Sequence, residues 1–233
     1  MSKITNLIVE SNKQKVAIEL DGRISFQVLV EIAIIFHLKI GQILEKIDIG
    51  KIVTASLSKE LYYQSLKLIA IRPRSVSETI AYCSRRFNQI LKHSVYIHLG
   101  DLINQTRIID KVIKELKLKK YLNDKEFTHW WIEQRQRSHP KGKLTLAYEL
   151  KQKGINPDII QAELSSHPLL TVEQVDSSIE KLLNKFWCQL EHQHLAKPLL
   201  KQRLLQRLLS RGYSYEQAKR QIDDFILRQY NTS

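Results

Sequence analysis

A short phrase recurs along this chain of 233 residues. It consists of two aliphatic residues four positions apart, then a basic residue, then a closing glycine. The clearest copy spans residues 146–154, a second spans 204–212, and a degraded one spans 80–88 and ends in Asn88 instead of glycine. The closing residues lie 66 and 58 positions apart. A period of this size predicts tandem helical units, so function is expected on the surface of an array instead of in one pocket.

The composition supports a helical protein of the cytoplasm. Seven glycines and five prolines are few for this length and favour long helices. No run of about 18 apolar residues predicts a membrane span, and no long apolar stretch near residue 1 predicts a secretory signal. The two cysteines, Cys83 and Cys188, are far apart and suit a reducing compartment. We therefore expect a cytoplasmic monomer with no membrane contact.

The first 50 residues have a β pattern. Residues 4–9 form an apolar-rich run, residues 16–20 alternate between apolar and polar, and Asp21-Gly22 then marks a tight turn. An Asp-Gly pair between alternating runs is a strong hairpin signal. The pattern predicts a two- or three-stranded antiparallel sheet, followed by a helix from about Ser25 or Gln27 to His37.

The rest of the chain predicts a mostly α fold of three tandem three-helix repeats. The second helix of the first unit is expected to end near Phe87. Residues 89–106 resemble an insertion, in which alternation around residues 95–99 suggests a strand-like excursion. The expected segments are 1–50 (β-hairpin and helix), 51–120 (first unit), 121–168 (second unit) and 169–233 (third unit).

Capping signals mark where several of these helices begin and end. Ser75 with Glu78 has the spacing of a capping box. Gly154 suits a left-handed C-cap, and Asn156 with Pro157 suits the start of the next helix. Further N-caps are expected at Thr171 with Gln174 and at Ser214 with Gln217.

The net charge of +13 is the strongest pointer to a partner. It attracts polyanions such as nucleic acid, an anionic membrane surface or an acidic protein. The basic residues gather around the middle helix of each unit: segments 72–92, 134–153 and 197–220 hold five, six and seven basic residues, each with one acidic residue. A solvated face, or capping of helix ends by Lys153 and Arg211, explains single positions. The recurrence favours an anionic partner along the array, bound through its phosphates.

Catalytic and metal-binding patterns are weak. No glycine-rich phosphate loop is present, and no nucleophile stands at a defensible spacing from a base. Cys188, His192 and His194 lack a fourth metal ligand. Trp130 and Trp131 point about 100° apart on a helix, so one is expected in the core and the other at its edge, where it could stack on a base. We expect no enzyme activity, cofactor or metal.

Longer segments carry a family resemblance. Residues 123–135 (NDKEFTHWWIEQR), 140–142 (PKG) and 149–155 (ELKQKGI) are similar to the RecX family of regulators of the RecA recombinase. Residues 72–78 resemble the opening of the family's first unit, and residues 21–42 resemble the N-terminal part of its longer members. The resemblance covers most of the chain and is most specific at its centre. Asn88 and the segment that follows depart from the pattern.

The resemblance implies an elongated array of three three-helix units without enzymatic activity. It implies binding to the RecA filament on DNA, contact with DNA, and limitation of filament growth or strand exchange in homologous recombination and DNA repair. A helix-turn-helix type of protein that acts directly on single- or double-stranded DNA is the alternative. Among the positions matched to the family, Asp124, Phe127, Gly142 and Gly154 are expected to be architectural. The candidates for contact are Arg72, Arg74, Arg135, Arg137, Lys141, Lys143, Lys151, Lys153, Arg203, Arg207 and Arg211.

Overall fold

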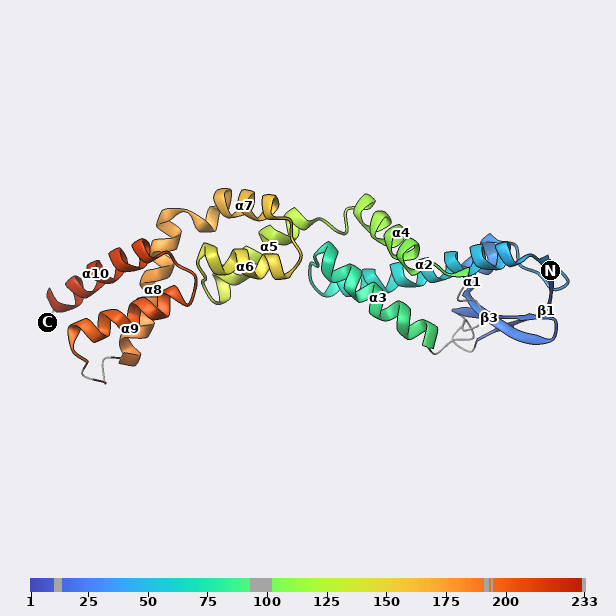
Figure 1. The fold of residues 1–233 in the computed structure, drawn as a ribbon, viewed down its shortest axis with the longest axis horizontal. Coiled ribbons are helices and arrows are strands. Elements are labelled where there is room, and N and C mark those ends of the chain that lie inside the picture. Colours follow the sequence, from blue (N-terminus) through green and yellow to red (C-terminus); the bar gives the residue numbers. More distant parts are fainter. Residues whose placement is uncertain (11–13, 93–101, 191–192, 194, 232–233) are drawn as a thin grey trace. The chain divides into compact units, whose positions relative to one another are not determined.

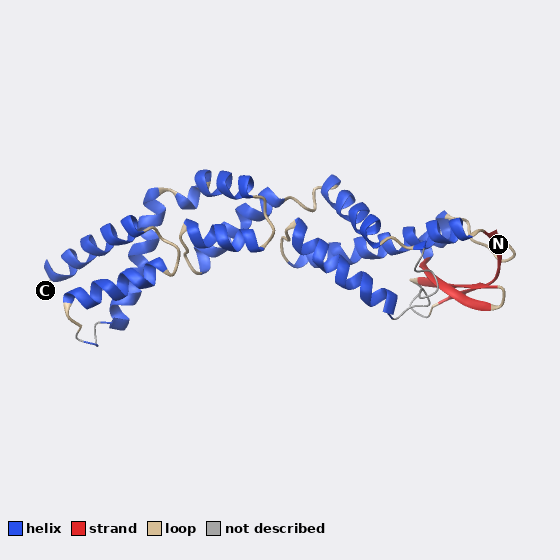
Figure 2. Cartoon of the chain, viewed as in Figure 1, coloured by secondary structure: helices blue, strands red, loops and turns tan. Residues whose placement is uncertain are grey.

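The computed structural model describes residues 1–10, 14–92, 102–190, 193 and 195–231. The chain forms two compact units, Met1–Asn123 and Asp124–Ser233 (Figure 1). All the described strands belong to the first unit, and the second is helical (Figure 2). None of the described helices is long and apolar enough to cross a membrane. The finer division into four segments stays a prediction.

The first unit begins with a four-stranded antiparallel sheet. Its strands are β1 (Ser2–Val9), β2 (Lys15–Leu20), β3 (Arg23–Leu29) and β4 (Ile43–Leu44), in the order β3-β2-β1-β4. The expected turn is confirmed, because Asp21 and Gly22 have φ angles of 50° and 81°. The sheet has one strand more than expected, since β4 pairs with the start of β1 from about 40 residues away.

The helix expected from about Ser25 or Gln27 to His37 is wrong in its first part. Residues 25–29 continue β3, and α1 spans only Val30–Ile35. Phe26 and Val28 are fully buried and stand opposite Ile18 and Val16 of β2. Their spacing of two residues places both on the core face of a strand, which a helix would not do.

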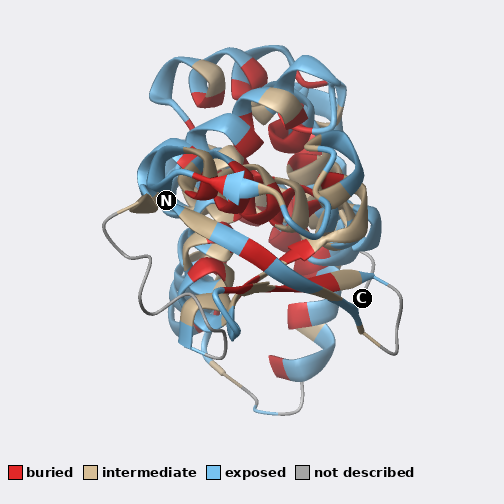
Figure 3. Ribbon diagram, turned by 90° about the vertical axis from the view of Figure 1, so that its right-hand side faces the viewer, coloured by how far each residue is buried: buried red, intermediate tan, exposed pale blue. Residues whose placement is uncertain are grey.

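Three helices complete the first unit: α2 (Lys46–Ile71), α3 (Val76–Lys92) and α4 (Gln105–Leu118). The sheet shares one hydrophobic core with them, and its buried residues appear in red on strands and helices alike in Figure 3. The Leu29 backbone N–H donates to Ser56 Oγ of α2 at 2.9 Å. The capping box is confirmed: Glu78 N–H donates to Ser75 Oγ at 3.0 Å.

Helix α3 also corrects an expected boundary. It continues past Phe87 to Lys92, so Asn88 is an exposed helical residue and needs no left-handed backbone. Residues 89–92 are therefore helical, and the expected strand-like excursion at residues 95–99 lies outside the described residues.

The second unit contains two three-helix repeats. The first comprises α5 (Asp124–Ser138), α6 (Lys143–Gln152) and α7 (Pro157–Ser166), and a short 3-10 helix, η2 (Pro168–Leu170), follows. The next comprises α8 (Val172–Leu190), α9 (Lys197–Leu209) and α10 (Tyr215–Asn231). Gly154 and Gly212 end α6 and α9 with φ angles of 72° and 82°, as their positions in the phrase predicted. Asn156 accepts from the Asp158 N–H and confirms the cap of α7.

Two glycines bring these repeats into direct backbone contact. Gly142, the N-cap of α6, donates its N–H to the Arg211 carbonyl at 2.8 Å. A Cβ on Gly142 would lie 2.0 Å from the Gly212 carbonyl oxygen, and one on Gly212 would lie 2.3 Å from Thr145 Oγ1. The positive end of α6 thus meets the negative end of α9, which is a favourable arrangement of helix dipoles. One hydrophobic core extends through both repeats.

We predict that Gly142→Ala destabilises the second unit by about 2–4 kcal/mol, because the added methyl group overlaps backbone atoms that cannot rotate away. Gly142 has a φ of −72°, which alanine adopts without strain, so the loss reports the close contact alone. Urea denaturation would measure it. In the control Gly50→Ala, the new methyl group meets Leu102 at an ordinary 3.5 Å. Equal stability of the two variants would contradict the prediction.

Candidate nucleic-acid interface

The middle helices α3, α6 and α9 present positive charge because their acidic residues are few and already bound. The only acidic residue of α3, Glu78, forms a bidentate ion pair with Arg72 at 3.0 and 3.2 Å. The only one of α6, Glu149, is largely covered, and α9 has none. The basic residues that these helices expose are therefore little neutralised by their own helix.

Glu149 is the centre of a cluster that joins α5 to α6. It accepts hydrogen bonds from Trp131 Nε1 at 2.9 Å, from Arg135 Nε at 2.8 Å and from Lys141 Nζ. Burial opposes ionisation of Glu149, but the hydrogen bonds from Lys141, Trp131 and Arg135 outweigh it, so the pKa of the carboxyl lies below its usual value. Arg135 and Lys141 thus stabilise the packing of α5 against α6 by binding Glu149.

The indole of Trp131 lies beneath two cations. The guanidinium carbon of Arg135 is 4.5 Å from the ring centroid, and Lys153 Nζ is 5.0 Å from it. Trp130 and Trp131 are both half-buried, so the expected division into one core and one edge residue is wrong. Phe127, 1% exposed, takes the core position, and the two indoles flank it.

The third repeat places cations on an aromatic ring in a similar way. The guanidinium carbons of Arg207 and Arg211 lie 5.1 and 4.8 Å from the centroid of Phe186. Arg207 also donates to Gln189 Oε1 at 2.9 Å, and Arg203 donates to Gln193 Oε1. Among the described residues, no carboxylate pairs with any of these three arginines.

The remaining candidates are scattered. Arg137 pairs with Glu133 on the same helix at 3.6 Å, and Lys143 and Lys151 are exposed on α6 without an ion pair to any described residue. Arg74, in the first unit, is half-buried. A contact role for each of the eleven basic residues stays a prediction. Sequence reasoning identified Glu149 as the only acidic residue between positions 134 and 153 but missed its role as the shared partner of Arg135 and Lys141.

A second polar cluster lies between α5 and α7. The rings of His129 and His167 are 4.3 Å apart, and His129 Nδ1 is 3.4 Å from Glu163 Oε2. His167 Nδ1 accepts from the Leu169 N–H, while its Nε2 is buried without a partner among the described atoms. Burial, and then the nearby His129, lower the pKa of His167.

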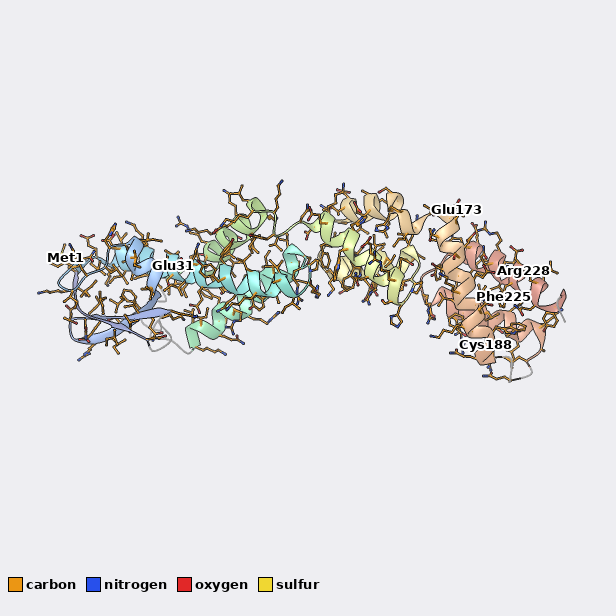
Figure 4. All side chains as sticks on the ribbon, turned by 180° about the vertical axis from the view of Figure 1, so that it is seen from behind. Met1, Glu31, Glu173, Cys188, Phe225 and Arg228 are labelled. Atoms are coloured by element: carbon orange, nitrogen blue, oxygen red, sulfur yellow. The ribbon has the colours of Figure 1, made fainter. Side chains whose placement is uncertain are left out.

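No group of three metal-binding side chains occurs among the residues that the structure describes. Cys188 is exposed near the end of α8, where Figure 4 labels it. His192 and His194, the other two members of the weak metal pattern, lie outside the described residues.

Comparisons with known proteins agree on one family. A family model described as RecX, second three-helix domain, matches residues 123–164, which hold α5, α6 and most of α7. The regulatory protein RecX of Bacillus subtilis (strain 168) is 30% identical over 209 residues, or 89% of this chain and 70% of that protein. The regulatory protein RecX of Bacillus pumilus (strain SAFR-032) is 28% identical over 218 residues, or 93% of this chain and 74% of that protein.

Two solved structures share the fold. The crystal structure of a regulatory protein RecX aligns with a TM-score of 0.66 and 21% identity, over 96% of this chain and all of that one. The crystal structure of RecX from Lactobacillus salivarius aligns with a TM-score of 0.60 and 19% identity, over 74% of this chain and 99% of that one.

The lowered pKa of His167 predicts a pH-dependent stability. The unfolded chain binds a proton at this histidine more readily than the folded one, so stability is complete above about pH 6.5 and falls as the pH drops below it. The slope from this group reaches at most about 1.4 kcal/mol per pH unit. His167→Asn should flatten the dependence between about pH 7 and 5, whereas the exposed His139→Asn should leave it unchanged. An unaltered profile in the first variant would refute the assignment.

The Glu149 cluster predicts that Glu149 contributes more to the free energy of unfolding than Glu133 does. Glu149→Gln keeps the shape of the side chain but leaves Arg135 and Lys141 without their anion, so we expect a loss of about 1–3 kcal/mol in the free energy of unfolding. Glu133→Gln removes a more exposed ion pair and should cost less than about 1 kcal/mol. Guanidinium denaturation of both variants tests this, and equal losses would argue against a structural role for Glu149.

Proposed function

Because this chain belongs to the RecX family of regulatory proteins, we propose that it regulates the RecA recombinase. In this proposal it binds the RecA–DNA filament through the basic faces of its middle helices and limits filament growth and strand exchange. It acts by binding, without a catalytic step of its own. The resemblance of residues 123–155 to regulators of RecA supplies the partner.

One observation carries the proposal. The middle helices expose basic side chains, whereas their acidic side chains are either absent or already bound in ion pairs. Glu78 and Glu149 are held by arginine and lysine side chains, and α9 has no acidic residue. A filament that contains DNA presents phosphates, whose neutralisation releases counterions and favours binding. Repetition of the cationic helix lets several weak contacts act together along a partner that is itself periodic.

Direct action on DNA is the second candidate, and the same faces favour it. Three-helix repeats with a basic helix are one known way to bind duplex DNA. The two candidates differ in the partner that is required. A filament regulator alters the behaviour of RecA, whereas a DNA-binding protein of this type binds naked DNA tightly and selects among sequences.

The decisive experiment uses RecA filaments that are assembled on single-stranded DNA before this protein is added. We expect the rate of DNA-dependent ATP hydrolysis and the filament length to fall. The double variant Lys143→Glu/Lys151→Glu should need about tenfold more protein for the same effect, because two exposed cations of α6 become anions. Lys181→Glu/Lys185→Glu, on the exposed side of α8, makes the same change in net charge outside the middle helices.

Two outcomes would contradict the proposal. If the wild-type protein leaves both ATP hydrolysis and filament length unchanged, regulation of RecA is excluded. If it also binds naked DNA tightly and selectively in physiological salt, the second candidate replaces it. Equal loss of effect in the α6 and α8 variants would reject the middle helices as the contact surface.

A further inference from the structure

Three arginines form a row along α9 and its end. Arg203, Arg207 and Arg211 are four residues apart, which places them on one side of the helix at steps of about 6 Å. The guanidinium carbons of Arg207 and Arg211 both lie about 5 Å from the centroid of the Phe186 ring, so they are within about 10 Å of each other. We call these three residues the α9 arginine row.

Neutral groups hold the row in place. Gln193 and Gln189 accept from Arg203 and Arg207, and Phe186 supports Arg207 and Arg211. The ring is only 3% exposed, so it serves as a platform for the arginines and is not open to a stacking base. Amide and ring contacts fix the direction of a guanidinium without cancelling its charge, unlike a carboxylate.

The repeat formed by α5, α6 and α7 has a carboxylate where the third repeat has an arginine. The recurring phrase places Arg207 at the position of Glu149 and Arg211 at that of Lys153, since each stands equally far before its closing glycine. Four residues beyond the ring that the cations contact, the second repeat has Arg135 and the third has the buried Leu190. In the second repeat, the carboxylate of Glu149 thus neutralises the basic cluster. In the third repeat, Arg207 stands at the same position and adds a positive charge.

Carboxylates are available in the third repeat but pair with other residues. Arg220 and Arg228 of α10, the latter labelled in Figure 4, form ion pairs with Asp176 and Glu180 of α8 at 2.9 and 2.7 Å. A position near the last carbonyls of α9 accounts for Arg207, which lies in the last turn, and for Arg211, but not for Arg203 in the middle of the helix. Support of the helix end therefore does not explain why three arginines line up without a carboxylate partner among the described residues.

We propose that the α9 arginine row binds the phosphodiester backbone of DNA, and that the cluster around Glu149 is structural. A guanidinium offers a planar fork of donors that matches a phosphate, and a regularly spaced row matches a ligand with regularly spaced anions. Because the arginines are already oriented, little side-chain freedom is lost on binding. This inference rests on the proposed function only in taking the DNA of the filament as the ligand.

The test measures binding of a fluorescent oligothymidine by the full-length protein in the absence of RecA. Gln189→Glu is the sharpest variant, because it keeps the hydrogen bond from Arg207 and turns a neutral partner into an anion. We expect the affinity to fall by about fivefold while thermal stability is kept or rises. Gln161→Glu, an equal change of charge on α7, should bind as the wild-type protein does.

A salt titration then estimates how many phosphate contacts Arg207 and Arg211 make. Arg207→Ala/Arg211→Ala should lower the affinity by more than about tenfold and reduce the slope of log affinity against log salt by about 1.4, or about 0.7 for each lost contact with a single strand. Lys219→Ala/Lys181→Ala, which removes two exposed lysines from α10 and α8, is the control. Polyglutamate should compete far less well than unlabelled oligothymidine at equal charge.

The inference is overturned if the wild-type protein does not bind the oligonucleotide, if Gln189→Glu binds as the wild-type protein does, or if polyglutamate competes equally well. Its failure is distinct from failure of the proposed function. An intact effect on RecA filaments with unchanged DNA binding in these variants would reject the row alone. Loss of DNA binding in the variants, with no effect of the wild-type protein on RecA, would reject RecA regulation and keep the row.

Discussion

The second unit depends on the contact between Gly142 and Gly212. Because neither residue has a side chain, the start of α6 reaches the end of α9, and the Gly142 N–H finds its acceptor on Arg211. Two repeats that would each bury too little apolar surface alone then share one core. The contact also brings the start of α6 to the end of α9, so the two cationic helices of this unit meet directly.

In each of the two units, acidic residues determine which basic residues have a structural role. Arg72, Arg135 and Lys141 are bound to carboxylates and hold elements of the fold together. The α9 arginine row is oriented by amides and a phenyl ring and keeps its charge. A count of basic residues along the sequence treats both groups alike, whereas the identity of the partner separates structural from surface charge.

Local signals in the sequence predicted much of the fold. Tandem three-helix repeats after a small β element are confirmed, as are the Asp21-Gly22 turn, the capping box at Ser75 and the left-handed glycines. The errors have physical causes. Strand β4 is two residues long and depends on pairing with the distant β1, and the continuation of β3 to Leu29 depends on burial against α2. The pairing of β4 is not visible in a local pattern, whereas the alternation of Phe26 and Val28 is visible and the expected helix disregarded it.

The candidate site was less predictable than the fold, because its contacts also join residues that are distant in the sequence. The basic residues around α6 and α9 were found by counting, but their contacts join different helices. Glu149 of α6 binds Arg135 of α5, 14 residues away, and Gln189 of α8 binds Arg207 of α9, 18 residues away. The partners of the α9 arginine row are neutral. Guanidinium groups remain protonated across the physiological range, and amides and phenyl rings do not titrate. Burial lowers the pKa of His167, so acidification below about pH 6.5 destabilises the folded second unit but leaves the charge of the α9 row unaltered.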